Sequence, residues 1–266
     1  MKRTATLLAI LLCGTASLHA AILISYPDIE ARSPNGRYLA EAKSPDNKNN
    51  NFGSFQSNFT VTLTDTETNK PVWSWKQGKD DGISPMELIP GDNGQLAMVF
   101  AWSGYVFFDS SGVEQGAFDV GKLIPDDELK KFTAYKFKET EWKQYSQQRF
   151  FTRDGAMYFY LRLYWGRTII IDVAKEKLET DGKIAEEVEK HVVEQTRRFI
   201  TEFNGEYYEK CGSHCVNNHP RKDLAAAVFI VKKHNLKEYQ EFMDEVVRRH
   251  EDAKYHELKR CLDLLE

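Results

Sequence analysis

The sequence predicts an α+β protein: an antiparallel β-meander of three similar units, followed by an α-helical C-terminal region. One observation is a turn signal that recurs at intervals of 58 and 61 residues, at Gly36, Gly94 and Gly155. A second is the hydrophobic period, which changes from two to about three and a half beyond residue 180, as it does where strands give way to helices. We therefore expect a β-repeat domain over residues 21–180 and a helical tail over residues 181–266, packed on or next to it.

Residues 1–20 have the features of a cleavable signal peptide. Lys2 and Arg3 precede an apolar run at residues 7–12, and small residues follow up to Ala20 and Ala21. The run is too short to span a bilayer comfortably, which weakens the alternative of a signal anchor. We expect no transmembrane segment once the signal is removed. The mature protein is then soluble and either secreted or periplasmic.

The composition is that of an ordinary globular domain. Hydrophobic residues make up 41% of the chain and charged residues 29%. The formal net charge of -4 does not suit a surface that follows nucleic-acid phosphates. We expect no nucleic-acid partner, and the function classes that remain are binding, scaffolding and catalysis on small or protein ligands.

Each repeat unit follows the same order of local signals. An Asx-Gly turn leads to an alternating strand, an aromatic or polar link, an apolar strand that ends in aspartate, and a polar turn. The strand-terminal aspartates are Asp65, Asp109 and Asp172. Aspartate suits this place because its side chain can accept a hydrogen bond from the backbone two residues further on. The expected strands cover residues 22–32, 38–42, 59–65, 72–75, 86–89, 96–102, 105–108, 147–151, 157–164 and 168–173.

Residues 33–38 (SPNGRY) and 62–70 (TLTDTETNK) show the pattern in full. It resembles β-propeller blades of the WD-repeat or quinoprotein-like kind over residues 30–180. The resemblance implies propeller-blade-like units. It implies no function, because the chain has no blade-defining Trp-Asp pair and no quinone-site motif. Three blades are too few to close a usual propeller. Four arrangements remain possible: an open meander, a curled barrel or sandwich, a ring built from two chains, or no propeller at all. We favour a compact meander whose open edges are covered by the helical tail.

Four helical segments are expected. Acidic residues at 126–128 follow Pro125 and suit the first turn of a short helix. Asp181 is an expected cap of a helix that stops near Gly205, and a further helix opens near Pro220 and ends at Asn235. The last helix carries an apolar stripe from residue 239 to residue 265. This stripe fits core packing, or a face that binds a partner or a second copy of the chain.

Metal-ligand chemistry can be placed at one cluster of the sequence. It comprises Cys211, His214, Cys215 and His219, whose thiols and imidazoles suit zinc or copper, although their spacing matches no standard zinc pattern. In an exported chain we expect a disulfide between Cys211 and Cys215 instead, so we assign no metal site. A bridge from Cys261 to either residue is the other pairing, and a redox role of the cluster is the weakest alternative.

Aromatic residues beside an arginine mark a possible ligand surface. Trp102 with Tyr105, and Trp165 with Arg167, occupy equivalent points in the second and third repeats. An aromatic ring next to a guanidinium can stack on a sugar or hold an acid, whereas the alternative is that each tryptophan packs between repeat units.

We therefore expect an exported binding or scaffolding protein of unknown ligand, with no cofactor and with a protein partner or self-association. The sequence assigns no catalytic residue and leaves open whether the protein is an enzyme, although it favours a binding role. Two alternatives remain: a hydrolase-type enzyme with dispersed catalytic residues, and a metal or redox site within residues 211–219.

Overall fold

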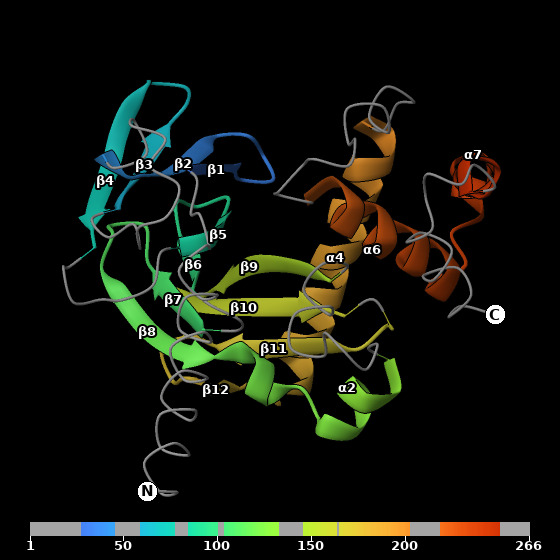
Figure 1. Ribbon diagram of the computed structural model, residues 1–266. Helices are drawn as coiled ribbons and strands as arrows, with labels where there is room; N and C mark the ends of the chain where they lie inside the picture. Colours follow the sequence, from blue (N-terminus) through green and yellow to red (C-terminus); the bar gives the residue numbers. More distant parts are fainter. Residues whose placement is uncertain are drawn as a thin grey trace, which may run out of the picture. The chain divides into compact units, whose positions relative to one another are not determined.

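The computed structural model describes residues 28–45, 59–77, 85–100, 104–132, 146–163, 165–202 and 219–250. They form three four-stranded antiparallel sheets and several helices (Figure 1). The prediction of an α+β protein with three antiparallel units is confirmed. The predicted signal peptide, the cysteines and Trp102 lie outside the described residues.

All three sheets are meanders, in which strands that follow one another in the chain are also neighbours in the sheet. The first sheet contains β1 (Ile29–Arg32), β2 (Tyr38–Lys43), β3 (Thr60–Asp65) and β4 (Lys70–Lys76). The second contains β5 (Pro85–Pro90), β6 (Leu96–Phe100), β7 (Gly104–Phe108) and β8 (Glu114–Asp119). The third contains β9 (Gln147–Arg153), β10 (Ala156–Arg162), β11 (Thr168–Asp172) and β12 (Lys177–Leu178).

The strands β8 and β12 were not predicted from the sequence. Both are the last strand of their sheet, and most of their residues are exposed or half-buried. Such strands need no alternation of apolar and polar residues, which is the signal that reveals a half-buried strand. The second and third units are therefore one strand longer than expected, whereas the fourth strand of the first unit was expected at residues 72–75.

The three predicted strand-terminal aspartates occupy the same place in the three sheets, directly at the end of the third strand. Asp65 accepts hydrogen bonds from the backbone of Glu67 (2.9 Å) and Thr68 (3.1 Å). Asp109 accepts from the backbone of residues 111 (2.8 Å) and 113 (3.0 Å). Asp172 accepts from the backbone of residue 175 at 3.1 Å. These bonds confirm that each aspartate caps the turn that leads to the fourth strand.

The turn glycines also recur at one place, between the first and second strands. Gly36, Gly94 and Gly155 have φ angles of 74°, 82° and 79°. This left-handed backbone is unfavourable for residues that carry a Cβ. The repeat seen in the sequence is thus a repeat of two turn chemistries, glycine before the second strand and aspartate after the third.

The chain divides into two compact units. The first holds residues 1–101 and 108–113, and the second holds residues 102–107 and 114–266, so strands of the second sheet belong to both. In the first unit, the rings of Trp73 and Trp75 pack on Phe108 with centroids 5.6 and 6.0 Å apart. In the second, Phe107 packs on Phe159 at 5.1 Å.

The helices begin near the predicted positions, and the first three also end near them, whereas the predicted end of the last helix lies outside the described residues. They are α2 (Asp126–Phe132), α4 (Gly182–Glu202), α6 (His219–Lys233) and α7 (Gln240–His250), with 3-10 turns η2 (Val120–Leu123) and η3 (Lys237–Tyr239). Asp181 caps α4 by accepting from the backbone of Lys183 at 2.8 Å, as predicted. Asn235 follows α6 with a φ of 50°, which suits a helix stop. No described helix is long and apolar enough to cross a membrane.

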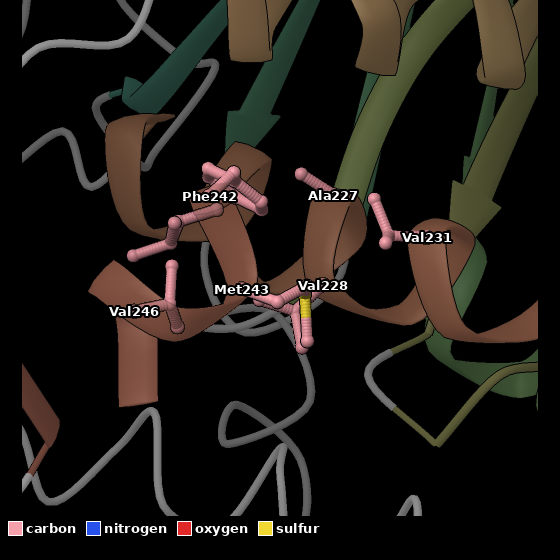
Figure 2. Packing of buried hydrophobic residues seen from close by; sticks show 7 residues of the cluster. Ala227, Val228, Val231, Phe242, Met243 and Val246 are labelled. Carbon is pink, nitrogen blue, oxygen red and sulfur yellow. The ribbon is translucent and has the colours of Figure 1, made fainter. Parts of the chain in front are cut away.

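Helix α4 packs on a face of the third sheet. Its apolar residues Ile184, Val188 and Val192 form one buried cluster with Tyr158 and Tyr160 of β10 and with Ile170 of β11. A second cluster joins α6 to α7, and Figure 2 shows Val228 and Met243 meeting between these helices. The predicted apolar stripe of the last helix is therefore core packing as far as residue 246.

Candidate functional site

The turn between β10 and β11 carries the predicted pair Trp165 and Arg167. The turn is closed by backbone hydrogen bonds between Leu163 and Arg167 and between Gly166 and Leu163, both 2.8 Å long. Trp165 is half-buried, and the side chain of Arg167 is 43% exposed. The structure thus places an aromatic ring and a guanidinium two residues apart on a tight turn.

One carboxylate holds both side chains. Glu128 of α2 accepts a hydrogen bond from Trp165 Nε1 at 3.0 Å through Oε2, and its Oε1 forms an ion pair with Arg167. The short helix α2 positions this carboxylate in its first turn, where acidic side chains are favoured. The interaction fixes the turn to α2 and leaves part of Arg167 facing solvent.

Behind the turn, Arg162 ends β10 in a buried position. Its side chain is 2% exposed, and its Nη1 donates to Glu189 of α4 at 2.8 Å and to Thr168 of β11 at 2.5 Å. The ring of Phe229 from α6 lies 4.8 Å from the guanidinium carbon. The same ring would lie 2.3 Å from a Cβ at Gly166, so Phe229 packs against both Arg162 and the turn.

Three basic side chains converge on Glu189. Besides Arg162, Lys233 Nζ and His234 Nε2 both lie 2.7 Å from Glu189 Oε1. Partial burial raises the pKa of Glu189, but the hydrogen bond from Lys233, the charge of Arg162 and the contact with His234 outweigh it and lower this pKa to about 2. Glu189 is therefore charged at neutral pH and joins α4 to β10 and α6.

One edge of the Arg162 guanidinium is unused within the described part of the chain. Its Nε and Nη2 are buried and have no hydrogen-bond partner there. Burial lowers the pKa of Arg162, and the nearby carboxylate of Glu189 works in the opposite direction. A buried donor without a partner is costly, so this edge is a place where a hydrogen-bond acceptor would be favoured.

The structure separates the predicted ligand contacts. Trp165 and Arg167 come together at the β10–β11 turn, whereas Tyr105 lies on β7, is 1% exposed and donates its hydroxyl to Gln148 Oε1 at 2.5 Å. Trp102 lies outside the described residues.

The candidate metal and disulfide residues are likewise not described. Cys211, His214 and Cys215 lie outside the described residues, and so does Cys261. His219 begins α6, but its side chain is also outside them. Within the described ranges, no three histidine, cysteine or acidic side chains are grouped as a metal ion would need.

Sequence reasoning missed the buried group around Arg162. A signal was present, because Tyr158, Tyr160 and Arg162 share one phase of an apolar strand, and an arginine on that phase should have a partner. Glu128, Glu189 and Lys233 gave no signal, because charged residues on a helix are ordinarily solvated. Tertiary packing decided which of them meet the strand.

Comparison with known proteins identifies no family. No family model and no curated protein matches the chain. Among solved structures, a chain described as Kluyveromyces lactis Hsv2 with a complete loop 6CD is similar, with 12% sequence identity and a TM-score of 0.29. The match covers 59% of this chain and 48% of that chain, about half its length. A likeness at this TM-score carries no argument about fold or function.

Proposed function

We propose that the protein is an exported, non-enzymatic binding or scaffolding protein whose ligand surface includes the β10–β11 turn. The observation that supports this is the shared carboxylate of Glu128, which holds the Trp165 ring and the Arg167 guanidinium together. A partly exposed ring beside a cation suits stacking on a ligand and holding an acidic group. Because backbone hydrogen bonds close the turn and Glu128 holds both of its side chains, little conformational entropy is lost when a ligand binds.

The test is a pull-down from the native cell envelope, with the mature protein as bait. We expect a partner that is retained by the unchanged protein and lost with Arg167→Gln and with Trp165→Ala. Arg153→Gln is the matched control, because Arg153 also forms an ion pair with a helix glutamate, Glu187 at 3.2 Å, on the same sheet. Circular dichroism checks that each variant is folded.

Two results contradict the proposal. The first is that no partner is captured at any bait concentration. The second is turnover in a broad hydrolase screen that disappears on a single substitution, which would establish the enzyme alternative.

Export is tested by N-terminal sequencing of the mature protein. We propose that residues 1–20 are removed, so the first residue found should be Ala21. An intact N-terminus on protein recovered from the envelope would point to an anchor instead.

We infer that the three sheets are propeller-type blades. Support comes from the sequential four-stranded order of each sheet and from the aspartate at the end of every third strand. Light scattering on the mature protein distinguishes two forms, because a ring built from two chains requires a dimer mass. A dimer mass would support such a ring, and a monomer mass would exclude it.

We also propose a disulfide between Cys211 and Cys215. Thiol titration of the denatured mature protein should then find one free thiol, that of Cys261. Three thiols accompanied by stoichiometric zinc or copper would move the functional site to residues 211–219.

A further inference from the structure

We propose that the Nε–Nη2 edge of Arg162 binds a small oxyanion, a carboxylate or a phosphate group. The ligand of the β10–β11 turn is then acidic. This second statement rests on the proposed binding function, whereas the anion site itself does not.

The Nε–Nη2 edge of Arg162 is the part of the guanidinium that can still donate to a hydrogen-bond acceptor. Nη1 is already engaged by Glu189 and Thr168, and the Phe229 ring lies against the guanidinium. The two remaining nitrogens point their N–H groups side by side, which matches the two oxygens of a carboxylate or phosphate. Arg162 is 2% exposed, so a charge-assisted hydrogen bond there is little weakened by water.

Charge balance favours an anion as well. The cations Arg162 and Lys233 face the single carboxylate of Glu189, and His234 contacts the same carboxylate. One negative charge is thus shared by at least two positive ones. Arg162 is 2% exposed whereas Lys233 is 44% exposed, so the attraction for a second anion comes mainly from the Arg162 guanidinium, whose charge is poorly screened in a medium of low dielectric.

The turn ties this edge to the proposed ligand surface. Gly166 and Arg162 pack on the same Phe229 ring, and Arg162 pairs with Thr168, the first residue of β11, across the strands. An acidic ligand held at the turn by Arg167 therefore lies close in sequence and structure to a second, buried guanidinium.

The experiment is a titration of the full mature chain, followed by the NMR resonance of the Arg162 Nε–H group. Sodium phosphate and sodium acetate are added in separate series at constant ionic strength, with sodium chloride as the reference. Arg162→Lys, which keeps the charge but removes the fork, identifies the resonance by its loss. We expect a saturable shift of this resonance with phosphate or acetate, and none with chloride.

The two anion series separate the possible ligands. A shift with phosphate alone assigns a phosphate-bearing ligand, and a shift with acetate alone assigns a carboxylate. Binding of the same anion, followed by thermal shift, should weaken at least roughly tenfold in Arg162→Lys and stay unchanged in Arg153→Gln. An Arg162 resonance that stays unmoved in both series, or that moves equally in chloride, overturns the inference.

Failure of this inference differs from failure of the proposed function. If Arg162→Lys captures the envelope partner as well as the unchanged protein does, the binding function stands and the statement that the ligand of the turn is held at Arg162 is wrong. If phosphate or acetate binds at Arg162 but no partner is captured, the anion site stands and the binding function is wrong.

Discussion

At the scale of single residues, Glu189 links three basic side chains, those of Arg162, Lys233 and His234. It is the counter-charge of a buried arginine and also the acceptor for Lys233 at the end of α6. A buried cation that loses its partner is strongly destabilising, because its charge is then neither paired nor hydrated. The stability of the third sheet and of two helices therefore depends on one carboxylate.

We expect Glu189→Gln to lower the free energy of unfolding by about 3 kcal/mol, near the lower end for broken buried pairs because Glu189 is partly exposed. Chemical denaturation measures the change. The control is Glu186→Gln, which removes a solvent-exposed pair with Lys190 one turn away and should change the stability far less, because water screens exposed pairs. Equal losses in the two variants would contradict the buried role of Glu189.

Acid should weaken the same interaction. The pKa of Glu189 is about 2 in the folded protein, below its ordinary 4.5. A lowered pKa contributes stability above the ordinary value, and this contribution is lost as the pH falls from 4.5 to about 2. We expect a loss of roughly 2 kcal/mol over that range after allowing for solvent screening. Denaturation at each pH compares the unchanged protein with Glu189→Gln, and the difference between the two isolates the contribution of Glu189. If the two plots of stability against pH were parallel, the prediction would be wrong.

Two glycines of the third sheet allow a matched test of backbone and packing. Gly166→Ala combines a φ of 94° with a Cβ 2.3 Å from the Phe229 ring, whereas Gly155→Ala has a φ of 79° and no atom within 4 Å. The second variant should lose about 1 kcal/mol from backbone strain alone, and the first should lose roughly 1–3 kcal/mol more. Thermal unfolding compares them. Similar losses would show that Phe229 yields to the added methyl group.

At the scale of elements, the three sheets share the hydrogen bonding of their turns, whereas the sequences of their strands differ. The three aspartates have different strand sequences before them, yet all accept backbone hydrogen bonds from the turn that follows. Such bonds decide where the third strand ends and how the fourth strand begins. This explains why β8 and β12 form without apolar alternation of their own.

We expect Asp109→Ala to cost about 1–2 kcal/mol, because the backbone donors of residues 111 and 113 lose their acceptor. Asp109→Asn keeps an oxygen in the same place and should cost less than half as much. Denaturation curves of the two variants provide the measurement. If the asparagine variant were as unstable as the alanine variant, the charge and not the hydrogen bonds would matter.

At the scale of the whole molecule, a helix buries an apolar sheet face that the strands alone would leave in contact with water. The face of the third sheet that carries Tyr158, Tyr160 and Ile170 is buried by α4. Burial of apolar area is the main favourable contribution to folding, so this face cannot be left in water without loss of stability. The second compact unit accordingly contains the third sheet together with the helices.

We therefore expect a chain of residues 21–180 to lack a cooperative thermal transition and to bind a hydrophobic dye. A chain of residues 21–250, which keeps every described helix, should unfold cooperatively and bind no dye. Differential scanning calorimetry with dye fluorescence makes the comparison. Cooperative unfolding of the shorter chain would show that the sheets are stable without α4.

The sequence by itself determined the three repeats, the glycine and aspartate turns, and the helices with their caps at Asp181 and Asn235. These features depend on neighbouring residues, because turn chemistry, capping and hydrophobic period are local properties of the chain. It also placed Trp165 beside Arg167, since two residues of one turn are near each other in any fold.

Tertiary structure decided the rest. Glu128 meets Trp165 from 37 residues away, and Glu189 meets Arg162 from 27 residues away. A charged residue on a helix looks solvated in the sequence whether or not a strand lies behind it. The sequence could not show which carboxylates face a buried guanidinium, because such a pairing depends on which face of α4 covers the third sheet.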